Sequence, residues 1–253
     1  MKLIPFILRV IPRQRLISLS YCVMRFTSFI YRGKNVECPV CSRTFRKFLP
    51  YGYNKVREGV LCPRCFSLER HRLLWLFLKN ETGFFEDSLK ILHVAPEQCF
   101  YRRFRAMNNL DYTTADLVSP LADVKIDVQA MPFENDSFDI VICNHVLEHV
   151  EDDIKAMKEI YRILRKGGFA IMQVPFNSSM EKTHEDSSIT DPRERERQFR
   201  QKDHLRLYGK DYTERVKKAG FVIRDKNYIE KVDDIMKQQY RLPEFEFMYA
   251  FYK

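Results

Sequence analysis

The sequence lacks the features that would anchor the protein in a membrane or export it. No apolar run reaches the ~18–20 residues that a transmembrane helix requires. The apolar segment Met1 to Ile11 is interrupted by Pro5 and Arg9, and no small-residue cleavage site follows it, so it is a poor signal peptide. The 253 residues are enough for one large α/β domain with a small appendage.

Acidic residues are scarce in the first third of the chain. Residues 1–36 contain seven Lys or Arg and no acid, and residues 1–80 hold 16 basic residues against three acids, an excess of 13. The other 173 residues therefore sum to −4, because the whole chain has a formal charge of +9. A basic front of this kind indicates an anionic partner: nucleic acid, a membrane surface or a phosphorylated substrate. The alternative is that these charges only solubilise a small, aromatic-rich module.

Residues 1–34 are predicted to form a basic, partly helical leader. Its basic side chains are interleaved with Leu, Ile, Phe and Tyr, a composition that can lie in a membrane interface. The segment could equally be a helix packed on the domain. Both interpretations leave the protein in the cytoplasm, the first of them peripherally at the inner face of a membrane.

The cysteines do not follow the pattern of a disulfide framework. Four of the seven form two Cys-Pro-X-Cys pairs, Cys38 with Cys41 and Cys62 with Cys65, separated by twenty residues. Cys-X-X-Cys places two thiolates on one tight turn, and two such turns close a tetrahedral site of four sulfurs. The pattern therefore predicts a structural metal site in a reducing compartment, with Zn²⁺ as the metal and iron as the alternative.

We expect the metal module to occupy residues 35–80, including a connecting helix from Ser67 to Lys79. Ser67 is a reasonable N-cap, and Glu69 in the first turn suits the helix dipole. A module of this size is expected to unfold without its metal.

Strands and helices alternate from Ser88 onward, which predicts an α/β domain over residues 88–253. The predicted strands are 90–95, 112–117, 124–128, 138–143, 169–174 and 221–223, with an edge or antiparallel strand within 245–252. The predicted helices are 99–107, 154–164 and 213–219, and Gly167-Gly168 and Gly220 are expected to end the last two. Residues 176–206 are expected to be a long loop or lid, with Arg193 to Arg197 as a solvated helix face.

The stretch from Lys125 to Val150 is the most informative part of the chain. Asp127 ends a short apolar run, a Met-Pro-Phe turn and a polar patch follow, and a buried strand then stops at Asn144-His145 before a helix. In an open parallel sheet, ligands bind outside the carboxyl ends of the strands, so these polar groups are well placed to face one. The arrangement resembles the nucleotide-binding half of the class I S-adenosylmethionine (SAM) methyltransferases, in particular the type 11-like group. The resemblance implies a Rossmann-like, seven-stranded methyltransferase sheet with SAM as cofactor.

The resemblance also implies a set of cofactor-binding residues. The family's glycine-rich loop after the first strand corresponds here to Leu92 to Glu97, which contains no glycine and is similar to a variant loop that reads His-X-Ala-Pro-Glu. Ala95 stands where a small residue is needed, and Asp116 would hold both ribose hydroxyls through charge-assisted hydrogen bonds. Asp127 would lie near the adenine amine. The implied set is His93, Ala95, Pro96, Glu97, Asp116, Leu117, Asp127, Val128 and Asn144, and the alternative for His93 is a packed core histidine.

Four residues are candidates for the methyl-transfer step. His145 follows the fourth strand, and His204 lies between Asp203 and Arg206 in the lid segment. Either histidine could act as general base for an alcohol or amine, with Arg206 holding an anionic group of the acceptor. The alternative for the acid-His-Arg string is a salt-bridged surface.

Glu148 and His149 are common features of the family, and we interpret them as mainly structural. Asn144-His145-Val146-Leu147 lacks the two prolines that amine methylases acting on bases carry at this position. This departure argues against methylation of the exocyclic amines of DNA or RNA.

Three hypotheses of function follow. The first is SAM-dependent methyl transfer to an O or N atom of a small-molecule, sugar or lipid-linked acceptor. The second is an RNA methyltransferase that binds RNA through the basic zinc module, because some ribosomal-RNA guanine methylases also place a cysteine module before a class I domain. The third is a non-catalytic binding protein that kept the fold and lost the glycine loop.

Overall fold

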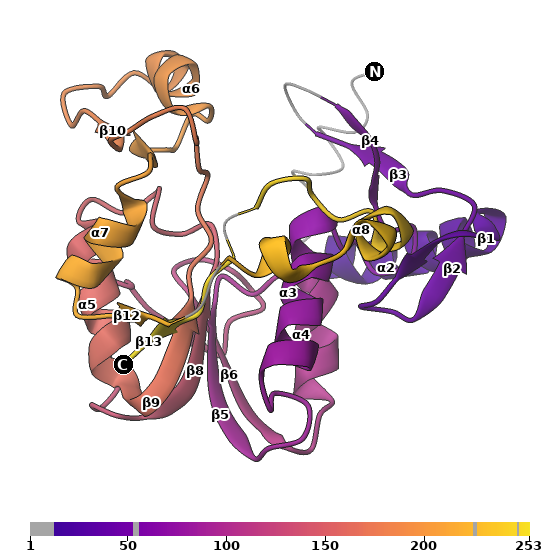
Figure 1. Cartoon of the computed structure of the whole chain (residues 1–253), viewed down its shortest axis with the longest axis horizontal. Coiled ribbons are helices and arrows are strands. Elements are labelled where there is room, and N and C mark those ends of the chain that lie inside the picture. Colours follow the sequence, from indigo (N-terminus) through magenta and orange to yellow (C-terminus); the bar gives the residue numbers. More distant parts are fainter. Residues whose placement is uncertain (1–12, 53–55, 225–226, 247) are drawn as a thin grey trace. The chain divides into compact units, whose positions relative to one another are not determined.

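The computed structural model describes residues 13–52, 56–224, 227–246 and 248–253 (Figure 1). The segment Met1 to Ile11, discussed above as a poor signal peptide, lies outside these residues. Contacts divide the chain into two compact units. The module unit comprises residues 1–87, 97–106 and 229–246, and the sheet unit comprises residues 88–96, 107–228 and 247–253. Because each unit is built from three separated segments, the predicted boundaries at residues 34, 80 and 88 stay predictions.

A seven-stranded sheet forms the centre of the sheet unit, with the strand order β12-β13-β9-β8-β5-β6-β7 (Figure 1). Its strands are β5 (Leu89–Val94), β6 (Leu110–Asp116), β7 (Val124–Lys125), β8 (Phe138–Cys143), β9 (Leu164–Ile171), β12 (Val222–Ile223) and β13 (Phe251–Tyr252). The pairs from β9 through β7 are parallel, whereas β13 runs antiparallel to both of its neighbours. The predicted Rossmann-like methyltransferase sheet is confirmed. The last strand is antiparallel as expected, but it lies inside the sheet and not at its edge.

The central strands read as continuous apolar runs because both of their faces are covered. Four of the six residues in β5 and five of the six in β8 are buried, as expected for parallel strands with helices on both sides. Helix α5 (Asp153–Ile163) buries Ala156, Met157 and Ile160 in the same core. Its amino end is capped by Asp152, whose carboxylate accepts a hydrogen bond from the backbone of Lys155.

The predicted start of the fifth strand, at residue 169, and the predicted role of Gly167-Gly168 were wrong. Helix α5 ends at Ile163 and the chain enters β9 at once, so Gly167-Gly168 lie inside the strand and do not stop the helix. Gly167 has a φ of +82°, and a Cβ on Gly168 would lie 2.6 Å from the carbonyl oxygen of Asp139. Gly168 therefore serves a close approach of β9 to β8, and Gly167 takes a left-handed backbone conformation; the sequence does not distinguish this pair from a helix end. Gly220, with a φ of +109°, follows α7 (Tyr212–Lys218) as predicted.

The predicted lid contains regular structure. Residues 176–206 include β10 (His184–Glu185) and α6 (Pro192–Phe199), and β11 (Arg206–Leu207) pairs antiparallel with β10. Helix α6 begins where its sequence favours a start: Asp191 accepts hydrogen bonds from two backbone amides, and Pro192 occupies the first turn. The charged run Arg193 to Arg197 lies on this helix, as expected.

The module unit consists of short strands and helices around a small core. Its strands are β1 (Arg32–Cys38), β2 (Arg43–Phe45), β3 (Leu49–Tyr51) and β4 (Arg57–Leu61), paired antiparallel as β1-β2 and β3-β4. Its helices are α2 (Arg13–Ile30), α3 (Glu69–Glu81), α4 (Gln98–Arg105) and α8 (Asp234–Tyr240), and the 3₁₀ turn η1 (Tyr228–Lys231) falls at the boundary. Trp75 of α3 stacks on Phe100 and Phe104 of α4, with interplanar angles of 10° and 7°. Helix α4 thus packs with the module, although the sequence places it inside the methyltransferase domain.

Helix α3 begins two residues later than predicted. Leu68 is the N-cap residue, and its backbone N–H donates to Nδ1 of His71 at 3.1 Å. Ser67 does not cap the helix, because its hydroxyl lies beside the cysteine sulfurs. Among the described helices, none is both long and apolar enough to cross a bilayer.

Candidate functional site

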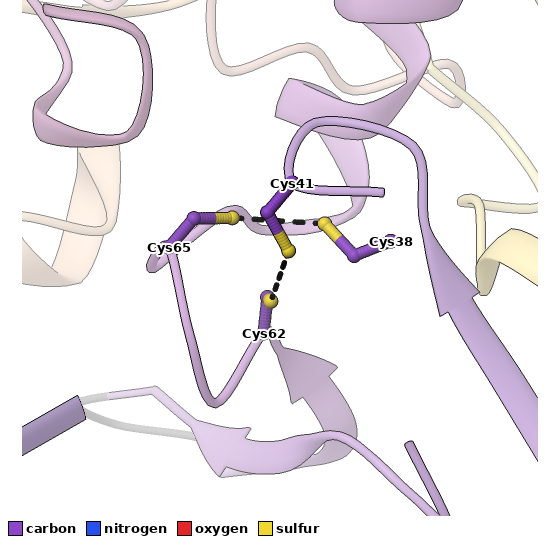
Figure 2. A group of neighbouring side chains, drawn as sticks. All are labelled: Cys38, Cys41, Cys62 and Cys65. Carbon is purple, nitrogen blue, oxygen red and sulfur yellow. Dashed lines mark hydrogen bonds between the residues drawn. The ribbon is translucent and has the colours of Figure 1, made fainter. Parts of the chain in front are cut away.

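The four paired cysteines converge on one point in the module unit (Figure 2). The Sγ atoms of Cys38 and Cys65 are 3.6 Å apart, and those of Cys41 and Cys62 are 3.8 Å apart. A tetrahedral Zn²⁺ with bonds of about 2.3 Å would hold its sulfurs roughly 3.8 Å apart. All four ligand atoms lie within 4.8 Å of one another. The residues therefore fit a tetrahedral ion with four thiolates, which is a closed and hence structural site.

Two polar residues that the sequence did not reveal surround this cluster. The Ser67 hydroxyl lies 3.1 Å from the sulfur of Cys38 and 3.3 Å from that of Cys65. The guanidinium of Arg72 is fully buried, and it donates to the carbonyl oxygens of Val60, Ser67, Tyr240 and Arg241 at 2.6–3.0 Å. Because four thiolates and one Zn²⁺ sum to −2, this buried positive charge is electrostatically favourable beside a loaded site.

The charge of Arg72 also acts on the thiols themselves. Burial alone would raise the pKa of Cys38, but hydrogen bonds from the other three cysteines and the nearby Arg72 charge bring it well below its usual range. Burial lowers the pKa of Arg72, and the sulfurs oppose that shift. One thiol of the cluster is thus favoured as a thiolate, the form that binds a metal.

The carboxyl ends of β5 and β6 bring together the two strongest cofactor candidates of the sheet unit. The backbone N–H of Ala95 donates to the carbonyl oxygen of Ala115 at 2.8 Å, one residue before Asp116. Ala95 has a φ of +51°, the left-handed conformation that glycine adopts most readily. The smallest chiral side chain therefore occupies a position with the backbone geometry of a glycine.

One of the two carboxylate oxygens of Asp116 is hydrogen-bonded to the loop that follows it. Its Oδ1 accepts the backbone N–H groups of Val118 and Ser119, each at 2.7 Å, and no other described residue donates to Oδ2. The next two side chains, Leu117 and Val118, are 67% and 74% exposed. The end of the second strand thus presents a carboxylate oxygen that is available to a ligand, next to two exposed apolar side chains.

Other residues of the implied cofactor set are less available. His93 is fully buried in β5, and its Nδ1 lies 2.8 Å from the Tyr112 hydroxyl, which favours the alternative of a packed core histidine. Pro96 is buried, and Glu97 occupies the N-cap position of α4 in the module unit. The Val128 side chain lies in the apolar core, which leaves only its backbone for a ligand.

Polar side chains at the ends of the next strands accept hydrogen bonds from nearby backbone groups. Asp127 is exposed, and its Oδ1 accepts the backbone N–H of Gln129 at 2.9 Å. Asn144 is buried, and its Oδ1 accepts the backbone N–H of Gln173 at 3.0 Å, while the backbone N–H of His145 donates to the carbonyl oxygen of Gln173 at 2.8 Å. The end of β8 is therefore fixed to the segment that follows β9.

The candidate base His145 is oriented by a buried carboxylate. Its backbone has a φ of +54°, and its Nδ1 lies 3.3 Å from Oε1 of Glu148. Its Nε2 is buried and has no hydrogen-bond partner among the described residues. The same holds for both side-chain polar atoms of Gln173, a residue that the sequence analysis missed because it is a single polar residue within the predicted apolar strand 169–174.

The string Asp203-His204-Leu205-Arg206 does not act as one unit. His204 is buried, and its Nδ1 lies 3.0 Å from the carbonyl oxygen of Phe199, whereas exposed Asp203 lies against His149. Burial lowers the pKa of His204, so its imidazole is neutral near pH 7.

Arg206 cannot serve as the predicted anion clamp in this geometry. Four of its N–H groups donate to Glu185 and to the carbonyl oxygens of Leu147, Val150 and Glu151 at 2.6–2.9 Å. Its side chain is only 4% exposed, so it supports the turn after β8 from inside.

One known protein family matches part of the chain. Residues 100–172 match the family model described as a methyltransferase domain. Over this part the chain is similar to the methyltransferase domain family. The match begins in α4 and ends at Met172, directly before Gln173, so it includes Asp116, Asp127, Asn144 and His145. The resemblance to methyltransferases that the sequence predicts is thereby confirmed.

Similarity to individual proteins covers shorter or more distant stretches. The chain is 40% identical over 58 residues to the ubiquinone/menaquinone biosynthesis C-methyltransferase UbiE of Xanthomonas oryzae pv. oryzae, a match that covers 23% of each protein. The chain thus spans about a quarter of the length of the curated relatives it matches. Among solved structures, an S-adenosylmethionine-dependent methyltransferase from Mesorhizobium loti has a TM-score of 0.49 at 14% identity, over 71% of this chain and 96% of that one. The [4+2]-cyclase SpnF has a TM-score of 0.48 at 18% identity, over 63% of this chain and 61% of that one.

Proposed function

We propose that the protein is a SAM-dependent methyltransferase that acts on an O or N atom of a small-molecule, sugar or lipid-linked acceptor. The observation that carries the proposal is the juxtaposition at the ends of β5 and β6. There, Ala95 has a left-handed backbone, and its N–H donates to the carbonyl oxygen of the residue before Asp116. The loop after Asp116 uses Oδ1 of its carboxylate, which leaves Oδ2 for a ligand. The methyltransferase family match over residues 100–172 supports the same conclusion.

The residues of the sheet unit have distinct tasks in this proposal. SAM supplies an electrophilic methyl group that is transferred in line. The carboxylate of Asp116 would accept the ribose hydroxyls, and exposed Leu117 would cover one face of the adenine. His145 would take the proton of the acceptor at Nε2, because an Nδ1–H donated to Glu148 leaves the lone pair on that nitrogen.

The cofactor is tested by titration calorimetry of SAM and S-adenosylhomocysteine with the zinc-loaded protein and its Asp116→Ala variant. Loss of two charge-assisted hydrogen bonds at about 1.5 kcal/mol each weakens binding about 100-fold. Asp111→Ala is the matched control, since this exposed acid lies at the start of the same strand. If the zinc-loaded protein did not bind SAM, the proposal would be refuted and a non-catalytic binding protein would be favoured.

A lipid-linked acceptor is favoured by the exposed face of α2. Leu19, Val23, Phe26, Phe29 and Ile30 expose between 49% and 74% of their surface. Four of them recur at spacings of three and four residues, which places them on one side of the helix. Co-sedimentation of the protein with anionic vesicles, lost in Phe26→Glu, is the expected result. Unchanged sedimentation of that variant would mean that this face of α2 does not bind the membrane, and it would remove the support for a lipid-linked acceptor.

RNA methylation is the second candidate, and a groove in the module unit is the observation that favours it. The groove has a volume of about 790 Å³ and is lined by four arginines together with Phe26 and Phe29. The arginines are Arg25, Arg32, Arg43 and Arg64. Basic side chains beside exposed aromatic rings suit a phosphate backbone with unstacked bases. RNA affinity that falls steeply with salt and is lost on Arg43→Glu would favour this candidate, whereas affinity unaffected by that change would exclude the groove as an RNA site.

A further inference from the structure

We propose that Glu148, His149 and His204 form a second metal site in the sheet unit, suited to a divalent first-row transition cation. The three residues offer one carboxylate oxygen and two imidazole nitrogens, and these ligand atoms all lie within 4.8 Å of one another. Glu148 and His149 belong to the turn after β8, and His204 precedes β11. The two segments are joined where the backbone N–H of Leu205 donates to the carbonyl oxygen of Glu148 at 2.8 Å.

Both histidines are oriented as metal ligands usually are. Nδ1 of His204 lies 3.0 Å from the carbonyl oxygen of Phe199. Nδ1 of His149 lies 3.2 Å from the carbonyl oxygen of Asp203 and 3.3 Å from its carboxylate. A hydrogen bond donated by Nδ1 fixes the tautomer and leaves the lone pair of Nε2 for a metal. The rings meet edge to face with centroids 4.7 Å apart, and one nitrogen of each ring lies within 4.8 Å of the other and of a Glu148 oxygen.

Two ligand atoms of this site are buried without a partner. Glu148 is only 1% exposed, and among the described residues its carboxylate has one hydrogen-bond contact, His145 Nδ1, 3.3 Å from Oε1. Oε2 of Glu148 and Nε2 of His204 bond to no group among the described residues. A buried carboxylate with one long contact is costly. A cation between Oε2 and the two imidazoles would satisfy both orphaned atoms and leave the His145 contact in place.

The donor set indicates the class of metal and the kind of site. Two imidazoles and one carboxylate are the ligands of many catalytic zinc sites, which keep a fourth position open for water or substrate. The same set also suits Mn²⁺ and Fe²⁺. Bonds of about 2.1 Å in tetrahedral geometry place donors roughly 3.4 Å apart, which small side-chain rotations would achieve here. The chain would thus carry one closed site of four sulfurs and one open site of nitrogen and oxygen donors.

The test counts metal ions in the full chain, independently of any methyl transfer. The protein is equilibrated with Zn²⁺ at micromolar concentration, freed of excess by gel filtration and analysed by elemental mass spectrometry. We expect two ions per chain in the native protein and one in His149→Gln. His149 is one-third exposed, so this variant should fold. His184→Gln is the control, because His184 is exposed and contacts Gln198, and it should retain two ions.

Cobalt substitution assigns each ion to its site. The cysteine module gives a sulfur-to-cobalt charge-transfer band in the near ultraviolet. The second equivalent should add visible d–d absorption without more charge transfer. This second step should disappear in His149→Gln and in Glu148→Gln, and Asp203→Asn should weaken it about 10-fold through the lost partner of His149. One ion per chain in the native protein, or a second ion retained in both His149→Gln and Glu148→Gln, would overturn the proposal.

Discussion

The sheet unit and the module unit differ in what fills their interiors. The sheet unit buries apolar side chains from β5, β8 and β9 against α5 and α7. The module unit also has apolar and aromatic contacts, but its centre holds the four cysteines, Ser67 and the fully buried guanidinium of Arg72. Stability in the first is spread over many interchangeable contacts. In the second it depends on a few polar groups around the predicted metal site, so a single change there should have a larger effect.

Metal removal should separate the two units most clearly. A structural Zn²⁺ contributes about 10–16 kcal/mol of apparent binding free energy, so chelation should unfold the module unit and leave the sheet unit folded. Hydrogen exchange would show amides of β1, β4 and α3 losing protection while those of β5 and β8 keep theirs. Equal loss of protection in both units would mean that they unfold as one body.

Arg72→Met should have the next largest effect. The variant leaves the carbonyl oxygens of Val60, Ser67, Tyr240 and Arg241 without their donor, and it removes the positive charge beside the sulfurs. We expect the free energy of unfolding to fall by about 4 kcal/mol and zinc release to be faster, as followed by a chromogenic chelator. Lys79→Met on the exposed face of the same helix is the control and should change neither quantity.

Ile160→Ala should have the smallest effect of the three and a different signature. Ile160 is fully buried in α5, and its truncation should cost about 3 kcal/mol through lost burial and a cavity. Because Ile160 lies in the sheet unit, zinc release should be unchanged. Urea unfolding beside Lys158→Ala, at an exposed position on α5, provides the measurement and its control. Faster zinc release in Ile160→Ala would contradict the separation of the two units.

Features that depend on a short stretch of chain were predictable. Strand β8 has the predicted bounds, 138 to 143, because an apolar run between turn residues defines a buried strand by itself. The cysteine pairs were equally evident, since Cys-X-X-Cys brings its own ligands together. The sheet topology followed from the family resemblance and not from the residues alone.

Features that depend on distant contacts were not predictable. Ser67 looks like an N-cap until the fold places its hydroxyl beside Cys38, 29 residues away. Asp203, His204 and Arg206 look like one site, but the fold gives each a different partner, and the Arg206 guanidinium binds the turn after β8. The proximity of Glu148 and His149 to His204 was not predictable either, because it spans more than 50 residues. The cofactor and catalytic roles, and cytoplasmic location, stay predictions.

Helix α4 has a consequence for how this protein could have arisen. The chain passes between the two units five times, after residues 87, 96, 106, 228 and 246. The helix that directly follows the Ala95-Pro96-Glu97 loop stacks its phenylalanines on Trp75 of the module. Neither unit can therefore be gained, lost or exchanged as one continuous piece of gene. Any continuous stretch that contains the whole sheet unit also contains residues 97–106 and 229–246 of the module unit, so neither unit can be exchanged without part of the other.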